Sequence, residues 1–215
     1  MVIGLLNLVN CVELMMNGNK PFSQACENNK QAILEVIQTV FDHTMTVWEI
    51  GSGTGQHACY FAEQLPHITW QPTDRAEAIA GIAAWREDAG LANLLPPQEL
   101  DVNAANWPCQ AIAGLFTANT LHIMSWLEVT VFFARLADYL NLSASVCIYG
   151  PFNYHGQYTS QSNADFDGFL KSRNPLSGIR DFEAVIALAA DSGLDLQKDV
   201  AMPANNRLLV FKKCR

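Results

Sequence analysis

Residues 49–55 read Glu49-Ile-Gly51-Ser-Gly53-Thr-Gly55 and place three alternating glycines directly after the apolar run Thr46–Ile50. A short apolar run of this kind predicts a buried strand, and residues 57–65 are predicted to form a helix. Glycines between a strand and a helix allow a tight turn and let backbone amides approach a ligand closely. The helix after the turn also begins with free N–H groups. We therefore predict a strand–loop–helix unit whose loop binds a ligand.

Strands and helices alternate along the rest of the chain. The predicted helices cover residues 24–42, 57–65, 76–89, 125–140 and 181–192, and the predicted strands cover residues 46–50, 67–74, 98–102, 112–118, 144–150, 194–200 and 207–212. Such alternation is typical of an α/β fold, in which helices cover both faces of a parallel sheet. The last two strands are separated only by the turn Met202-Pro-Ala-Asn-Asn206, so we expect one antiparallel strand at this edge.

Composition and charge restrict the class of protein. The chain has 215 residues, of which 50% are hydrophobic and 16% are charged, and this fits one domain with a sizeable core. Its formal net charge is −8, and an acidic surface repels phosphate backbones, so no nucleic-acid partner is expected. The six cysteines form no CxxC pair and the five histidines have no metal-ligand spacing. We therefore predict free thiols, no metal site and a reducing, cytoplasmic location.

The first sixteen residues are largely apolar, and no lysine or arginine precedes Lys20. A signal peptide would need a basic n-region, and the apolar run is too short to span a bilayer. We predict an N-terminal extension at residues 1–19, with Met16 as an alternative start, and one domain at residues 20–215. No association with a membrane is expected.

Acidic residues end the two predicted strands that follow the glycine cluster. Asp74 lies 19 residues beyond Gly55, and Asp101 is followed by Val102. Ligands of an open α/β sheet bind at the carboxyl ends of its strands. A carboxylate at Asp74 can accept both hydroxyls of a ribose. A carboxylate at Asp101 can accept the exocyclic amine of an adenine while Val102 packs on the ring.

The spacing of the glycines separates classes of nucleotide site. The dinucleotide fingerprint is G-x-G-x-x-G, whereas the glycines here follow a G-x-G-x-G pattern preceded by Glu49. A P-loop requires a lysine after its glycines, and Gln56 stands there instead. A nicotinamide-dependent oxidoreductase and a P-loop site are therefore disfavoured.

The segment Glu49–Gly55, together with Asp74 and Asp101, resembles the cofactor site of class I S-adenosylmethionine-dependent methyltransferases. More narrowly, the chain from about Lys20 to its C-terminus is similar to the methyltransferase-like twenty-six family (domain of unknown function 938). The stretches that carry this second resemblance are Lys20–Lys30, Ala118–His122, Tyr149–Phe152, Ser162-Asn163, Asp165–Asp167, Gly178–Phe182 and Met202–Asn206. The resemblance implies a Rossmann-like class I methyltransferase fold with a seven-stranded, mostly parallel sheet and one antiparallel strand. It also implies S-adenosylmethionine as the cofactor, and it assigns no substrate.

The predicted site residues follow the strand ends. The expected cofactor contacts are Glu49, Gly51, Ser52, Gly53, Thr54, Gly55, Asp74, Asp101, Val102, Asn119, Leu121 and Asn28. His122 stands where a reacting group would sit, either as a general base or as a residue that lines the methionine end of the cofactor. Asn28, with Asn29 and Lys30, is expected either to close over the cofactor or to cap its helix.

The polar segment Asn153–Arg180 is long for a connection in such a fold and carries several aromatic residues. Long loops are commonly functional lids. We expect an irregular segment that folds over the sulfonium end of the cofactor, with Tyr154 and Arg180 as further catalytic candidates beside His155 and Asp165. The alternative is a solvated loop in which Arg180 forms a structural ion pair.

Two motifs of nucleic-acid methyltransferases are disfavoured. Pro108-Cys109-Gln110 resembles the nucleophile motif of cytosine-5 methyltransferases, but it precedes the fourth strand instead of following it. We therefore expect Cys109 to lie away from the site. Asn119-Thr-Leu-His122 lacks the prolines and the terminal aromatic residue of amino-group methyltransferases that act on nucleic acids.

Two functions remain open at this point. The first is a methyltransferase that acts on a small molecule or on a protein side chain. The second is a non-catalytic module that binds S-adenosylmethionine and regulates a partner. The sequence also leaves open whether the chain forms a homodimer.

Overall fold

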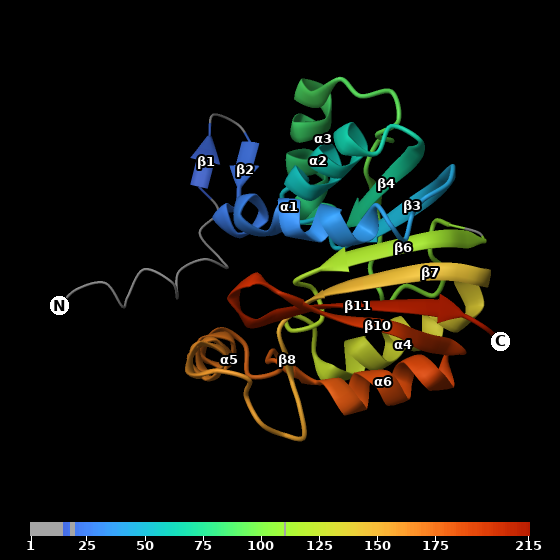
Figure 1. Cartoon of the computed structure of the whole chain (residues 1–215). Helices are drawn as coiled ribbons and strands as arrows, with labels where there is room; N and C mark the ends of the chain where they lie inside the picture. The colour runs from blue at the N-terminus through green and yellow to red at the C-terminus, as the bar shows by residue number, and fades with distance from the viewer. Residues whose placement is uncertain (1–14, 18–19, 110) are drawn as a thin grey trace.

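A computed structural model describes residues 15–17, 20–109 and 111–215, and these contain a central sheet of seven strands (Figure 1). The spatial order of the strands is β10 (Leu194–Met202), β11 (Asn206–Lys213), β7 (Leu140–Gly150), β6 (Ile112–Ala118), β3 (Met45–Ile50), β4 (Ile68–Asp74) and β5 (Gln98–Glu99). Strand β11 runs antiparallel to both of its neighbours, and the other pairs are parallel. The predicted mostly parallel sheet with one antiparallel strand is therefore confirmed.

The strand order reverses between β3 and β6. From β3 the chain continues to β4 and β5 on one side, and then crosses to β6 and β7 on the other side. A crevice forms at such a reversal because the loops after the two central strands leave in opposite directions. The loops after β3 and β6 therefore face each other at the carboxyl edge of the sheet.

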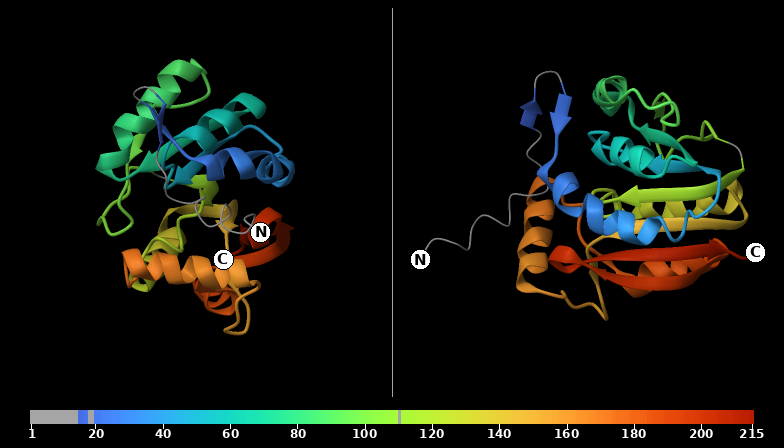
Figure 2. Two further views of the ribbon diagram at one scale, coloured as in Figure 1. Left: turned by 90° about the vertical axis from the view of Figure 1, so that its left-hand side faces the viewer. Right: turned by 45° about the horizontal axis from the view of Figure 1, so that its top comes forward.

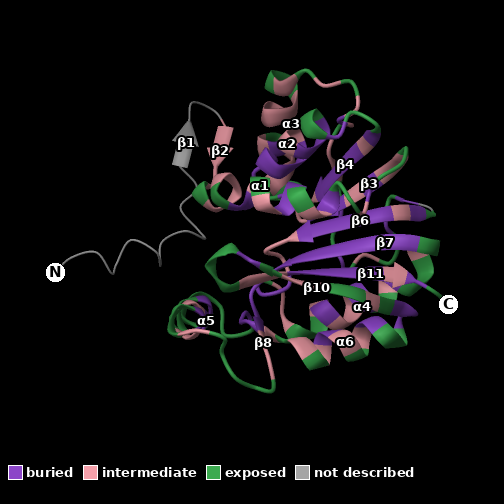
Figure 3. Ribbon diagram, viewed as in Figure 1, coloured by how far each residue is buried: buried purple, intermediate pink, exposed green. Residues whose placement is uncertain are grey.

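Helices cover both faces of the sheet (Figure 2). On one face lie α1 (Gln24–Ile37) and α2 (Gln56–Gln64), with α3 (Ala76–Ala89) packed beside α2. On the other face lie α4 (Trp126–Tyr139) and α6 (Phe182–Asp191), which contact each other. Two buried clusters fill the layers between helices and sheet (Figure 3).

Helix α4 illustrates how the sequence determines these layers. Its side chains Val129, Phe132, Phe133 and Leu136 are fully buried, and they recur at the spacing of one helical face. Burying each of them contributes roughly 2 kcal/mol. The helix begins at a capping box in which the Ser125 side chain accepts from the Glu128 backbone N–H. These local signals explain why the predicted bounds of this helix nearly match the observed ones.

The prediction of an irregular segment at Asn153–Arg180 is wrong. Residues 161–173 form helix α5 (Gln161–Arg173), and the short strands β8 (Phe152–Asn153) and β9 (Arg180–Asp181) pair in parallel on either side of it. The buried positions of α5 are Asn163, Asp167 and Leu170, so its inward face is largely polar. An apolar periodicity, which is the usual sequence signal of a helix, is therefore missing.

Two other predicted elements are shorter than expected. The predicted strand at residues 98–102 is reduced to Gln98–Glu99, and the predicted helix at residues 24–42 ends at Ile37. Most of the predicted extension at residues 1–19 lies outside the described residues. The backbone of β1 (Met15–Asn17) is described, and it pairs antiparallel with β2 (Lys20–Phe22).

Strand β2 is fastened to α3. The Lys20 ammonium forms an ion pair with Asp88 and lies over the ring of Trp85 at 4.4 Å from its centroid. The indole N–H of Trp85 donates to the Pro21 carbonyl at 2.7 Å. Within the described ranges, no helix has the length and apolar character needed to cross a bilayer.

Candidate functional site

A cavity of about 950 Å³ lies at the carboxyl edge of β3, β4 and β6. Its size falls within the range of roughly 300–1,000 Å³ that is typical of small-molecule sites. The sequence-predicted residues that line it are Gly51, Ser52, Gly53, Thr54, Asp74, Asp101, Val102, Asn119 and His122. The predicted residues that do not line it are Asn28, Glu49, Gly55, Leu121, Tyr154 and Arg180. The residues that surround this cavity come from six different parts of the chain, which the fold brings to one place.

The glycine loop between β3 and α2 has a backbone that only glycines adopt readily. Gly51, Gly53 and Gly55 have φ angles of +74°, +58° and +89°. A Cβ on Gly51 would lie 2.8 Å from Thr120 Oγ1, and a Cβ on Gly55 would lie 3.0 Å from the Cα of Ile82. Around Gly53, by contrast, no described atom would lie within 4 Å of a Cβ. Gly51 and Gly55 thus permit close packing, whereas Gly53 leaves space open beside the cavity.

Asp74 is held against this loop by two backbone amides. The Gly53 N–H donates to Oδ2 at 2.7 Å, and the Arg75 N–H donates to Oδ1 at 2.7 Å. Burial raises the pKa of Asp74, and these two hydrogen bonds oppose the rise. Each carboxylate oxygen has a second lone pair, so the oriented side chain can accept two further hydroxyl donors.

Asp101 and Val102 follow β5 and reach the same cavity. Asp101 is exposed, and its Oδ1 accepts from the Asn103 N–H at 2.8 Å, which fixes the turn after the strand. The Val102 side chain is 7% exposed and belongs to the core beneath the cavity. A carboxylate beside an apolar surface suits a flat heteroaromatic ring that carries an amino group.

His122 lies in the loop after β6 and is 3% exposed. Its ring stands edge-on to Phe166, with the centroids 5.4 Å apart, and its carbonyl accepts from the Gly178 N–H. Burial, together with the charge of Arg180, lowers the pKa of His122 to about 3. Among the described residues, none forms a hydrogen bond with a ring nitrogen of His122. The cavity is therefore lined by a neutral imidazole whose ring nitrogens are not engaged by the part of the chain that the structure describes.

Asn119 precedes His122 in a left-handed conformation, with φ of +57°, and its N–H donates to the Tyr149 carbonyl at 2.8 Å. A non-glycine residue held in this region is uncommon, and such residues are found often at functional sites. Leu121 points the other way and is buried in the core at 5% exposure. Of these two predicted cofactor contacts, Asn119 lines the cavity and Leu121 supports the loop from below.

Arg180 is a predicted catalytic candidate, and it lies close enough to His122 for its charge to lower the pKa of that ring. Its guanidinium donates to the backbone carbonyls of Leu121, Met124 and Leu176 and does not line the cavity. Three backbone carbonyls gathered in one place favour a cation there. Arg180 therefore anchors the His122 loop to the residues after α5, and it does so through carbonyls instead of an ion pair.

Tyr154, the other predicted catalytic candidate of this segment, lies outside the cavity lining. Its hydroxyl donates to Asp199 Oδ2 at 2.8 Å, and its ring stacks on Phe182 with the centroids 4.8 Å apart. Burial and the neighbouring Asp199 raise the pKa of Tyr154.

The other two candidates of this segment also lie outside the cavity lining. Asp165 accepts from Gln161 on the surface of α5, and exposed His155 pairs with Glu183. Of the described segment Asn153–Arg180, Asn174 is the residue that lines the cavity.

Two other predicted contacts lie outside the cavity lining, Glu49 beneath the glycine loop and Asn28 on α1. Glu49 is 1% exposed, burial raises its pKa, and its Oε2 accepts from the Trp70 indole N–H at 3.0 Å. Asn28 is exposed on α1 and accepts from Gln24. Its neighbour Asn29 is buried, with its Oδ1 at 2.7 Å from His57 Nε2.

Cys109 lies in the core at 5% exposure, away from the cavity lining, as expected for a motif that precedes the fourth strand.

Sequence reasoning missed most of the wall formed by the start of the domain. Residues 21–26, from β2 into α1, line the cavity, as do residues of α3 and the beginning of α4. The Ser23 N–H donates to Gln56 Oε1 at 2.6 Å, which joins this wall to the first turn of α2. The stretch Lys20–Lys30 carried a resemblance to a family, but no residue pattern in it predicted which side chains face inward.

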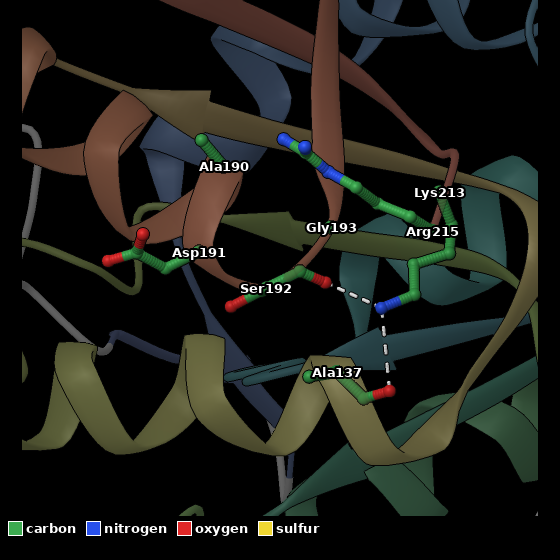
Figure 4. Close-up of a pocket in the computed structure, with 7 residues that line it drawn as sticks. All are labelled: Ala137, Ala190, Asp191, Ser192, Gly193, Lys213 and Arg215. Atoms are coloured by element: carbon green, nitrogen blue, oxygen red, sulfur yellow. Dashed lines mark hydrogen bonds between the residues drawn. The ribbon is translucent and has the colours of Figure 1, made fainter.

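A second, smaller hollow of about 490 Å³ lies at the opposite edge of the sheet (Figure 4). Lys213 dominates it and donates to the carbonyls of Ser192 at 2.5 Å and Ala137 at 3.4 Å. These carbonyls belong to the ends of α6 and α4, where a cation offsets the helix dipoles. The lysine is already satisfied by these contacts, so this hollow is structural. In the part of the chain that is described, no cluster of His, Cys, Asp or Glu could hold a metal ion.

Comparisons with known proteins identify a matching family and several solved structures of similar fold. A family model described as "Protein of unknown function (DUF938)" matches residues 20–213. An O-methyltransferase family protein from Burkholderia thailandensis has a TM-score of 0.77 at 16% identity, over 86% of this chain and 56% of that one. An O-methyltransferase family 2 protein from Planctomyces limnophilus, solved with apigenin, has a TM-score of 0.77 at 15% identity, over 88% of this chain and 58% of that one. The YcgJ protein from Bacillus subtilis has a TM-score of 0.68 at 12% identity, over 86% of this chain and 99% of that one.

At these identities the likeness is one of fold. It confirms the predicted Rossmann-like methyltransferase fold for the described sheet and its helices. The chain spans little more than half the length of the two O-methyltransferase family proteins.

Proposed function

We propose that this chain transfers the methyl group of S-adenosylmethionine to a small-molecule or protein acceptor. The chain belongs to the family described as "Protein of unknown function (DUF938)", and that description assigns no activity. One observation carries the proposal. Gly53, Asp74, Asp101 and an uncommitted His122 meet in a single cavity at the strand reversal. The closer resemblance to the methyltransferase-like twenty-six family stays a prediction.

The residues present fit S-adenosylmethionine. Asp74, oriented by two amides, would accept the ribose hydroxyls, and Asp101 with Val102 would hold the adenine. The open space at Gly53 would let the ligand lie close to the loop backbone. When bound, S-adenosylmethionine supplies an electrophilic methyl group on a sulfonium that is a good leaving group.

His122 would orient the acceptor. A neutral imidazole can accept a hydrogen bond from an O–H or N–H group and so hold its lone pair toward the methyl. The low pKa makes His122 a weak base, so proton removal would come late, as the new bond forms. Positioning can supply much of the rate in such a reaction.

Calorimetry tests the cofactor assignment. We expect S-adenosylhomocysteine to bind and NAD to produce no measurable heat. Binding of NAD without binding of S-adenosylhomocysteine would refute the proposal. Consumption of S-adenosylmethionine with a metabolite extract then tests turnover, and binding without any product would favour the non-catalytic regulatory module.

A further inference from the structure

The charged side chains that line the cavity gather at one end. Arg75 and Glu77 flank Asp74 and form an ion pair with each other at 2.7 Å. Glu128 reaches toward the turn after Asp101, because its Oε1 accepts from the Asn103 side chain at 3.4 Å, while its Oε2 is committed to the Ser125 N–H at 2.6 Å. We call this the acidic end, and it comprises Asp74, Arg75, Glu77, Asp101 and Glu128.

Of the other lining residues, His122, Ile123 and Met124 come from the loop after β6, and together with Asn174 they form what we call the uncharged end. None of these four described lining residues carries a charge at neutral pH, because burial keeps His122 neutral. Arg180, whose charge acts on His122, is occupied by three backbone carbonyls. A charged ligand group at this end would therefore find no ionic partner among the residues that line it.

Two exposed apolar residues belong to the segments around the uncharged end: Ile123, which lines the cavity, and Leu176, which does not. Ile123 is 48% exposed and Leu176 is 65% exposed. They are held together, since the Ser177 hydroxyl donates to the Ile123 carbonyl at 2.7 Å and Arg180 joins the carbonyls of Met124 and Leu176. Exposed apolar side chains gathered around a cavity mark a ligand surface more than isolated ones do.

We propose that the methyl acceptor is an uncharged small molecule with an apolar body, which packs on Ile123 and Met124, and a hydroxyl group that donates to His122. The inference rests on the proposed function, and it selects among the acceptors which that function allows. A lysine or arginine side chain would bring a cation that none of the four residues of this end can pair, and the carboxylate of Glu128 is already committed to the Ser125 N–H. A carboxylate or phosphate would bring an anion that no free cation can pair. Burying an unpaired charge is far less favourable than burying an uncharged group.

Three probes separate charge from shape: para-ethylphenol, tyramine and para-hydroxyphenylacetate. They share a ring and a hydroxyl, and their side groups are neutral, cationic and anionic. Calorimetry and ligand-detected NMR would measure their binding to the whole protein, both free and saturated with S-adenosylhomocysteine. We expect para-ethylphenol to bind at least about tenfold more tightly than either charged probe.

Ile123→Glu provides a switch of specificity, because an exposed side chain at the cavity mouth tolerates a charge without loss of the fold. It should move the preference toward tyramine by about tenfold. Leu127→Glu is the matched control, since Leu127 is 72% exposed in the first turn of α4 and does not line the cavity. It should leave the order of the three probes unchanged.

Three outcomes would overturn the inference: no binding of para-ethylphenol, equal or tighter binding of a charged probe, or no change of preference in Ile123→Glu. Absence of S-adenosylhomocysteine binding would instead refute the proposed function. The two failures are distinguishable because the charge preference is also measured on the free protein.

Discussion

The acidic end and the uncharged end of the cavity are held in place by different parts of the molecule. At the acidic end, the backbone of the glycine loop and the amide that follows Asp74 orient the carboxylate directly. At the uncharged end, the His122 loop is fastened by Ser177, Gly178 and Arg180, which lie more than fifty residues further along the chain. The first end is therefore held by two consecutive strand–loop units, with Gly53 only 21 residues before Asp74, and the second depends on how a more distant segment packs.

The largest effect is expected at the acidic end. Asp74→Ala would remove two charge-assisted hydrogen bonds to the ribose, each worth roughly 1.5–3 kcal/mol. We expect the affinity for S-adenosylhomocysteine to fall by about a hundredfold or more. Calorimetry measures the change, and Glu63→Ala on the exposed side of α2 is the control. An unchanged dissociation constant would show that Asp74 only stabilises the turn.

A substitution of Arg180 tests whether the distant segment holds the His122 loop in place. Arg180→Met would leave the carbonyls of Leu121, Met124 and Leu176 without their donor. Unpaired buried acceptors cost about 1–3 kcal/mol each, and partial solvation of this group should limit the total loss of unfolding free energy to about 3 kcal/mol. Urea unfolding measures it. Arg173→Met, on the exposed side of α5, should change stability by less than about 0.5 kcal/mol.

The same substitution shows whether Arg180 only anchors the His122 loop or contacts the acceptor directly. If Arg180 acts through the loop, S-adenosylhomocysteine should still bind within a few-fold, while the binding of para-ethylphenol weakens. A variant that keeps its stability but loses all binding of the probe would instead place Arg180 in direct contact with the acceptor.

This difference between the two ends explains what could be predicted from the sequence. The glycine loop, Asp74 and Asp101 were predicted to lie at strand ends, and they do, because glycine spacing and strand periodicity are local signals. The role of the segment 153–180 could not be predicted in this way. Helix α5 buries Asn163 and Asp167, so its inward face resembles a solvated one in sequence. Whether Arg180 points into the cavity or behind it depends on contacts with residues 121–124, which no local pattern records.

The pH dependence of stability tests the burial of His122. Its pKa is about 3 in the folded protein and 6.5 in its ordinary state, so the unfolded chain binds one more proton between these values. The free energy of unfolding should therefore fall as pH drops from about 6.5, by up to about 1.4 kcal/mol per pH unit from this group. His57, whose pKa burial also lowers, adds a loss in the same direction.

His122→Gln isolates the contribution of His122. Between about pH 7 and about pH 5, the variant should lose less stability than the parent chain, because it has one histidine fewer to protonate on unfolding. Urea unfolding at both values measures the difference. Equal losses in the two proteins would mean that His122 is accessible to protons in the folded state.

The smallest effect is expected for Tyr154→Phe, which tests whether the segment 153–180 takes part in catalysis. The substitution removes the hydrogen bond from the hydroxyl to Asp199. It keeps the ring stacked on Phe182, and Asp199 retains its 2.7 Å contact with Arg207 Nε. The loss of unfolding free energy should therefore be about 1 kcal/mol or less.

Methyl transfer and the binding of S-adenosylhomocysteine should stay within about twofold of the parent chain in Tyr154→Phe, since the hydroxyl lies outside the cavity. Tyr60→Phe is the matched control, because its hydroxyl likewise donates to a side chain, Gln31, far from the cavity lining. His122→Gln, in contrast, should reduce turnover by about a hundredfold, the scale of a lost proton acceptor. A tenfold or greater loss of turnover in Tyr154→Phe, with stability and cofactor affinity preserved, would contradict this assignment. The uncharged end would then have to include the segment that the structure places behind it.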